Sequence, residues 1–237
     1  ETAVRKASSV CPDSVRPLSV TVTESMQEAL VLSLHRFLCS KKGGFGIERV
    51  ENGFDEQKVH ATFFLRHRPD HIAQIRREIR EGHTIANHTY SHRIKAVYQS
   101  AESCIKEIRD QQQWLTETFG VTPEIYRFPG GSPTAGNKKQ AIAAALAADG
   151  LGYVDWNCHT GDGLPGELTA QKAYQNAVNS TGEQKIVVML MHDYSRATLA
   201  ALPDIIDTLK DKGYLLMPLF RDLSLIHISE PTRHLRI

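Results

Sequence analysis

From about residue 58 onward, short apolar runs alternate with helical patterns, and this alternation constrains the fold more than any other feature. The apolar runs cover 59–65, 84–86, 124–128, 151–156, 185–191 and 214–219, and the helical patterns cover 70–80, 101–118, 137–149, 169–179 and 198–212. Strands that alternate with helices usually run parallel, with the helices outside. The chain is therefore predicted to be an α/β protein, either an open doubly wound sheet or a barrel, with its chemistry at the carboxyl ends of the strands.

The first 57 residues are less regular. Residues 18–23 alternate like a strand, whereas residues 25–38 place Met26, Ala29, Leu30 and Leu34 at helical spacing. We therefore expect a helix over 25–38.

Composition excludes several classes of protein. The 28 Lys and Arg residues nearly balance 27 Asp and Glu residues, for a net charge of +1, which argues against a nucleic-acid-binding protein. No apolar run approaches the roughly 20 residues of a membrane-spanning helix. The chain starts at Glu1 without a signal-peptide pattern, which indicates a fragment or a processed form. Cys39, Cys104 and Cys158 lie in apolar or helical patterns and are predicted to be buried free thiols.

Two histidines follow the second predicted strand of this repeat, in the segment His88-Thr89-Tyr90-Ser91-His92. If the segment is helical, side chains four residues apart share one face and can bind the same divalent ion. The alternative is a polar turn with two partly exposed histidines.

Three further groups of polar residues come at later strand ends. Arg127 leaves a strand into a Pro-Gly-Gly turn, where it could orient a carboxylate. Asp155 and Asp162 follow the next strand and could be partners of Arg127, or simple helix caps and loop carboxylates. His192 ends the most apolar strand, as expected of a general acid or base, with Asp193 placed to orient it; a hydrogen-bonded core histidine is the alternative.

Taken together, these segments resemble the polysaccharide deacetylase family, the NodB-homology domain of carbohydrate esterase family 4, in the form found in Gram-positive bacteria. The resemblance runs from about residue 59 to 220. Its most specific part is the string from Gly82 to His92, GHTIANHTYSH, followed by RFPGGS from Arg127, DWN from Asp155 and LMHD from Leu190.

The resemblance implies a distorted (β/α)7 barrel of parallel strands with outer helices, and hydrolysis of N-acetyl groups on an amino-sugar polymer such as peptidoglycan or chitin. It implies one divalent metal ion, zinc in the first place and cobalt as an alternative, bound by His88 and His92. His192, Arg127 and Asp162 would be the catalytic residues, His192 protonating the leaving amine and Arg127 holding the base with Asp162 behind it. Gly130, Leu190, Trp156 and Tyr126 would bind the substrate.

The sequence departs from the family in its first motif, which normally supplies two aspartates, the general base and a metal ligand. Counting back from the strand at 59–65 places that motif at 37–44, where Lys41 and Lys42 stand instead. An ammonium group cannot bind a metal ion and repels it. His159 and Gly163 likewise replace an aspartate and a tryptophan of the fourth motif. We expect either a catalytically inactive, glycan-binding relative or an active enzyme whose sequence is damaged near this point.

The resemblance divides the chain into three parts: residues 1–33, of uncertain structure; residues 34–222, the deacetylase domain with a poorly preserved first strand; and residues 223–237. This last segment contains LSLIHISEPTR, similar to the translation of a sequencing-library adapter, so we expect it not to be native. The resemblance further implies a monomer, a polysaccharide substrate, no nucleic-acid partner, and a location outside the cell or in its envelope. A non-enzymatic glycan-binding module would instead rely on the aromatic residues near the motifs, which are Tyr90, Tyr126, Trp156 and Tyr194.

Overall fold

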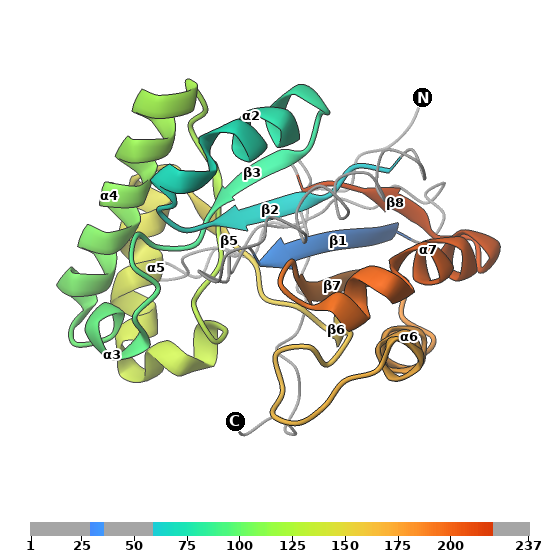
Figure 1. Cartoon of the computed structure of the whole chain (residues 1–237). Helices are drawn as coiled ribbons and strands as arrows, with labels where there is room; N and C mark the ends of the chain where they lie inside the picture. Colours follow the sequence, from blue (N-terminus) through green and yellow to red (C-terminus); the bar gives the residue numbers. More distant parts are fainter. Residues whose placement is uncertain (1–28, 36–58, 220–237) are drawn as a thin grey trace, which may run out of the picture.

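A parallel β-sheet forms the centre of the molecule. The computed structural model describes residues 29–35, as backbone, and residues 59–219. Its sheet has eight strands, and every paired strand runs parallel to its neighbour (Figure 1). The strands are β1 (Ala29–His35), β2 (Thr62–Leu65), β3 (Thr84–Asn87), β4 (Ile125–Tyr126), β5 (Gly152–Tyr153), β6 (Cys158–His159), β7 (Ile186–His192) and β8 (Leu215–Met217).

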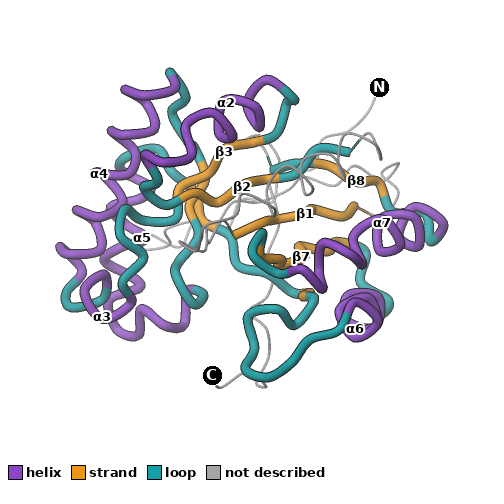
Figure 2. Tube along the Cα trace, viewed as in Figure 1, coloured by secondary structure: helices purple, strands orange, loops and turns teal. Residues whose placement is uncertain are grey.

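The order of the strands is β5-β4-β3-β2-β1-β7-β6, and β8 pairs with β1. Helices lie outside the strands, as Figure 2 shows. They are α2 (Ile72–Arg80), α3 (Ile94–Val97), α4 (Ala101–Phe119), α5 (Lys139–Ala148), α6 (Ala170–Thr181) and α7 (Arg196–Asp211), with short 3-10 segments at Pro69–His71 and Ser132–Lys138. The predicted α/β class and the parallel arrangement of a distorted (β/α) barrel are confirmed.

The helix predicted over 25–38 is wrong, because residues 29–35 form β1. This strand is central. It pairs with β7 along its whole length, with β8 over the three residues that start at Ala29, and with β2 over the three residues that end at His35. A short run such as ALVLSLH is apolar at both periodicities, so spacing alone does not distinguish a helix from a strand that is covered on both faces. Pairing with β2, β7 and β8 shows that the segment is a strand, and this strand crosses the predicted domain boundary between 33 and 34.

The other predicted elements form close to their expected positions, and their ends follow from local chemistry. The helix α4 begins where the Ser100 side chain accepts a hydrogen bond from the Ser103 amide, and it ends at Gly120 with φ 70°. Two short elements, α3 and β6, were not predicted. Cys104 and Cys158 are buried free thiols, as expected, and Cys39 lies outside the described residues.

Alternation along β2 shows how the strands divide the core. Phe63 packs with residues of β7 and α7 such as Met189 and Ile205, whereas Phe64 packs on the opposite face with Ala86 and Val188. Successive strand residues point to opposite faces, so a strand with both faces covered is apolar throughout. This packing holds the carboxyl ends of β2, β3 and β7 at the same edge of the sheet, with β1 between β2 and β7.

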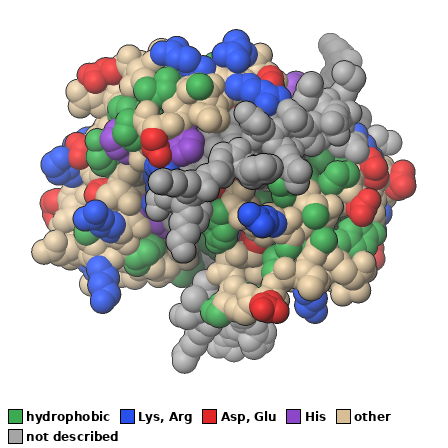
Figure 3. Space-filling model, in the orientation of Figure 1, with side chains coloured by type: hydrophobic (Ala, Val, Ile, Leu, Met, Phe, Trp, Pro, Cys, Tyr) green, Lys and Arg blue, Asp and Glu red, His purple; other side chains and the backbone are tan. Residues whose placement is uncertain are grey.

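The outer surface mixes both signs of charge. Figure 3 shows Lys and Arg side chains interspersed with Asp and Glu on the face that it presents. Among the described helices, none is long and apolar enough to cross a membrane. The predictions for residues 1–28 and 223–237, and for Lys41 and Lys42, concern segments outside the described residues.

Candidate active site

The pair His88 and His92 lies directly after β3. Their Nε2 atoms are 3.1 Å apart. The Nδ1 atom of His88 lies 2.8 Å from the carbonyl oxygen of Arg127, and because a carbonyl can only accept, this Nδ1 carries the proton. The neutral His88 ring therefore has its lone pair on Nε2, the atom that faces His92.

The two histidine rings lie in contact, but not on a helix, which was one of the two alternatives that the sequence left open. Residues 88–92 form a loop, and two non-glycine residues in it adopt left-handed backbone conformations, Thr89 with φ 66° and His92 with φ 56°. Such conformations cost about 1–3 kcal/mol each and persist only where surrounding contacts enforce them. The loop thus brings the two rings together by a strained backbone path.

Contacts from neighbouring elements hold this loop. Glu107 on α4 accepts hydrogen bonds from the Ser91 amide at 2.6 Å and from the Ser91 hydroxyl at 2.8 Å. The buried Asn87 side chain accepts from the Thr89 amide at 3.0 Å. The Tyr90 ring stacks on His67 with ring centroids 4.1 Å apart. Together these contacts compensate for the two left-handed residues.

Burial keeps both histidine rings neutral. It lowers the pKa of His88 well below its ordinary value, and the charge of His92 lowers it further. Burial, followed by the charge of Arg66, lowers the pKa of His92 to about 4. Since a neutral imidazole is the form that binds a metal ion, the pair is available as a ligand near neutral pH.

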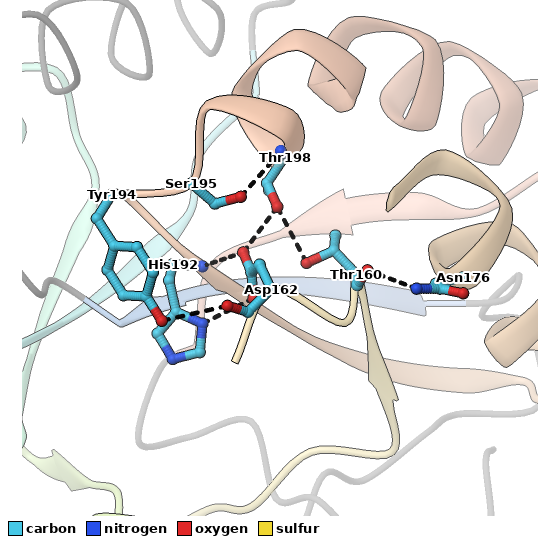
Figure 4. A network of polar contacts seen from close by, with 7 residues as sticks. All are labelled: Thr160, Asp162, Asn176, His192, Tyr194, Ser195 and Thr198. Carbon is cyan, nitrogen blue, oxygen red and sulfur yellow. Dashed lines mark hydrogen bonds and ion pairs between the residues drawn. The ribbon is translucent and has the colours of Figure 1, made fainter. Parts of the chain in front are cut away.

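A second group is built around Asp162 and His192, at the end of β7 (Figure 4). The carboxylate of Asp162 lies 2.7 Å from His192 Nδ1 and accepts from the His192 amide at 2.8 Å. Thr198, in the first turn of α7, donates to the same carboxylate at 2.7 Å. Burial raises the pKa of Asp162, but the hydrogen bonds from His192 and Thr198 outweigh it, and the net shift is downward.

Asp162 is therefore the carboxylate that orients His192, in the place predicted for Asp193. The side chain of Asp193 is buried, but it makes no described hydrogen bond to His192. The loop after β6 runs beside β7, so a residue thirty positions earlier is closer in space than the next residue in the chain. The same geometry corrects the expectation that Asp162 stands behind Arg127.

Arg127 is fully buried rather than poised on a surface turn. Its Nε donates to the Val154 carbonyl at 3.0 Å, a terminal nitrogen donates to the Asp155 carbonyl at 3.1 Å, and its guanidinium lies 4.0 Å from the centre of the Phe64 ring. Burial lowers the pKa of Arg127 to about 9, and the charge of Asp155 opposes this. The Asp155 carboxylate itself binds the Ser132 amide and hydroxyl rather than the guanidinium.

The four predicted substrate-binding residues fall into two groups. Tyr126 is fully buried among Val97, Cys104 and Phe128, so the prediction that it contacts substrate is wrong and the residue belongs to the core. Alternation along β4 explains this, since Tyr126 points to the face that α4 and α5 cover. The other three residues lie near the site: Gly130 is exposed with φ 74°, Leu190 is 8% exposed, and Trp156 is half-buried, with Arg127 5.8 Å from its ring.

Comparison with known proteins finds a family that resembles part of this chain. The family model described as polysaccharide deacetylase matches residues 46–151. The chain is similar to this family over those residues. It is 29% identical, over 173 residues, to a peptidoglycan-N-acetylglucosamine deacetylase of Bacillus cereus; the alignment covers 69% of this chain and 60% of that protein.

Two solved structures resemble this chain. One is the catalytic domain of a peptidoglycan N-acetylglucosamine deacetylase from Eubacterium rectale, with a TM-score of 0.75 and 26% identity over 90% of this chain and 98% of that one. The other is a family 4 carbohydrate esterase from Streptococcus mutans, with a TM-score of 0.74 and 27% identity over 82% and 87% of the two chains.

The two histidine groups lie at the same edge of the sheet. His88 and His92 follow β3 and His192 ends β7, and these two strands run parallel with β2 and β1 between them. Among the described side chains, no third His, Cys, Asp or Glu joins them in a metal-binding cluster. The strand β1 ends between them, because His35 pairs with His192 on one side and with Phe64 on the other.

Sequence reasoning missed two residues that shape the site, Glu107 and Thr198. Neither belongs to a motif, because each acts from a helix on a residue of another element. Thr198 stands three residues after the helix-capping Ser195, which is a recognisable signal for a helix start but not for a contact with Asp162. Glu107 carries no sequence signal of its role.

Proposed function

We propose that this domain removes N-acetyl groups from an amino-sugar polymer of the peptidoglycan or chitin type, with the help of one divalent metal ion. The observation that carries the proposal is the His88 and His92 pair, with Nε2 atoms 3.1 Å apart and His88 Nδ1 committed to a backbone carbonyl. Two nitrogens bound to one tetrahedral zinc ion lie roughly 3.3 Å apart. A metal-bound histidine usually donates its other ring N–H to a carbonyl or carboxylate, as His88 does.

The residues present therefore fit zinc, with cobalt as the alternative. His88 and His92 would hold the ion, which when bound would polarise the acetyl carbonyl and acidify a water molecule. The described part of the chain supplies these two ligands.

His192 is the proposed general acid, which protonates the leaving amine nitrogen of the sugar. Asp162 holds its Nδ1, so Nε2 is the nitrogen left to face the substrate. Because Thr198 and the His192 amide also bind this carboxylate, the imidazole is fixed in one orientation. Leu190 would contact the acetyl methyl group, and the backbone amide of Gly130 would stabilise the oxyanion.

Arg127 carries a buried positive charge, and its carbonyl oxygen binds His88. We propose that it orients the catalytic base, although its described hydrogen bonds go to backbone carbonyls. The chain lacks an evident catalytic base, because Lys41 and Lys42 occupy the positions that sequence counting assigns to the aspartate pair. We therefore expect the chain as written to be a poor catalyst.

The test is acetate release from chitin oligosaccharides and peptidoglycan by the full chain, with and without a chelator. We expect weak turnover, together with zinc binding that is lost in His88→Ala and His92→Ala. Turnover that is fast and that the chelator abolishes would refute the assignment of the first motif to 37–44. Absence of zinc binding would refute the metal site.

Two double variants locate the first motif. Sequence counting predicts recovery from Lys41→Asp with Lys42→Asp, whereas the register of β1 points to His35→Asp with Arg36→Asp, at the strand end beside His192. Recovery of zinc affinity and acetate release in one of them identifies the position. Glycan binding without recovery in either favours a non-catalytic relative.

The relatives bear on location and substrate. Since the chain spans about 60% of the Bacillus cereus relative, the activity of the whole protein is part of the proposal. That relative is named for peptidoglycan, and we propose that this domain also acts at the cell envelope. Chitin remains a candidate because a chitin deacetylase of Colletotrichum lindemuthianum is 29% identical over 177 residues.

A further inference from the structure

Tyr194 contacts both members of the Asp162 and His192 pair. Its hydroxyl donates to the Asp162 carbonyl oxygen at 3.2 Å, and its ring lies 5.1 Å from the His192 ring at an interplanar angle of 33° (Figure 4). The side chain is nevertheless 43% exposed. The Tyr194 ring is thus held by a hydrogen bond and by a ring contact, yet much of it is exposed. This is unusual for a purely structural residue, because burial of its apolar area would stabilise the fold and exposure does not.

The backbone of Gly163 lies close to the imidazole of His192. A Cβ atom at Gly163 would lie 2.9 Å from His192 Cε1, so a larger residue cannot stand there without displacing the ring. Leu164, the next residue, is 36% exposed. Tyr194 thus presents apolar surface to solvent beside a histidine that is itself only 7% exposed.

The phenol of Tyr194 remains a neutral hydrogen-bond donor over the working pH range. Burial, followed by the charges of Asp162 and Asp193, raises its pKa to about 12. The hydroxyl therefore keeps its bond to the Asp162 carbonyl, and the ring loses little conformational freedom when a ligand covers it. A rigid, neutral aromatic face suits the apolar C–H face of a pyranose ring rather than a charged group.

We propose that Tyr194 is a substrate-binding residue, whose ring stacks on a pyranose unit of the polymer and holds it against His192. This inference rests on the proposed function and adds to it a specific contact with the sugar. It predicts that Tyr194 distinguishes a saccharide from an acetyl donor that has no sugar ring.

The experiment uses the full zinc-loaded chain and compares Tyr194→Ala and Tyr194→Phe with the unaltered protein. Calorimetry measures the affinity for chitopentaose, and acetate release gives kcat and KM for that oligosaccharide. Release of 4-nitrophenol from 4-nitrophenyl acetate reports on the same machinery without a sugar. The controls are Tyr174→Phe, which removes a hydroxyl bonded to Thr208 away from the site, and Leu215→Ala, which removes a side chain that is 54% exposed on β8.

We expect Tyr194→Ala to weaken chitopentaose binding about tenfold, the loss of one stacked aromatic contact, and to raise KM more than it lowers kcat. Hydrolysis of 4-nitrophenyl acetate should change less than about twofold, a difference well below one stacking contact. Tyr194→Phe keeps the ring and should retain most of the affinity, as should both controls.

Unchanged chitopentaose affinity in Tyr194→Ala would overturn the inference and leave the proposed function standing. An equal loss for sugar and ester would also overturn it, because the residue would then act only through His192. Failure of the unaltered chain to bind any chitooligosaccharide or peptidoglycan fragment would refute both this inference and the proposed function.

Discussion

Removal of the Glu107 carboxylate should release the loop that carries His88 and His92. The side chain is half-buried on α4 and accepts two hydrogen bonds from Ser91, at 2.6 Å and 2.8 Å. A hydrogen bond to a charged group contributes about 1.5–3 kcal/mol, and partial exposure favours the lower end of that range. Two such bonds therefore contribute about 3 kcal/mol.

Opposing these bonds are the two left-handed residues of the loop, Thr89 and His92. At the low end of the usual cost they store about 2 kcal/mol together. In Glu107→Ala the two left-handed residues remain strained, but the two hydrogen bonds that compensate for the strain are lost. We therefore expect the loop conformation that brings His88 and His92 together to be populated in only a minority of molecules. A loss of about 2 kcal/mol corresponds to roughly a 30-fold weaker apparent affinity for zinc.

The assay is a calorimetric zinc titration of the full chain against a competing chelator, with thermal unfolding measured in parallel. Glu107→Gln keeps one acceptor oxygen and should show an intermediate loss. The matched control is Glu117→Ala on the same helix. Its exposed carboxylate accepts a hydrogen bond from Gln113, one helical turn earlier in α4, and not from the loop. If Glu107→Ala binds zinc as tightly as Glu117→Ala, the loop does not depend on Glu107 and the reasoning fails.

Two further predictions concern the Asp162 and His192 pair. The pKa of Asp162 lies below its ordinary value of 3.8, so the stability that it supplies is complete above that pH and is lost as the pH falls through the lowered pKa. In urea unfolding between pH 5 and pH 2, Asp162→Asn should therefore lose stability less steeply on acidification than the unaltered chain; equal slopes would contradict this. Gly163→Ala should displace the His192 ring, since its Cβ would stand 2.9 Å from Cε1. We expect acetate release to fall about tenfold or more at unchanged zinc affinity, and unchanged release would show that the ring can move at no cost.

Most of the fold could be predicted from the sequence, because the alternation of strands and helices over 59–219 is regular. The failure at β1 has a physical cause. The run from Ala29 to His35 has paired strands on both edges, and its apolar residues show no period that favours a strand over a helix. Only pairing with distant strands decides its conformation.

At the site, the sequence indicated which residues take part better than it indicated how they are held. The spacing of His88 and His92 predicted their meeting, yet a strained loop rather than a helix brings it about. Asp193 was expected to orient His192 because it is adjacent in the chain, and Asp162 does so because β6 lies beside β7. Neighbours across parallel strands are not visible in local spacing.

The position of β1 between β2, β7 and β8 also bears on how the chain folds. Strands β1 to β5 can pair in the order in which they are synthesised, but the other edge of β1 must wait for β7, since Ala29 pairs with Ile186 and His35 with His192. Contacts between residues so distant in sequence slow folding. During synthesis, β1 cannot complete its pairing until the segments that carry His192 and β8 have left the ribosome, so His192 arrives with one of the last two strands of the sheet.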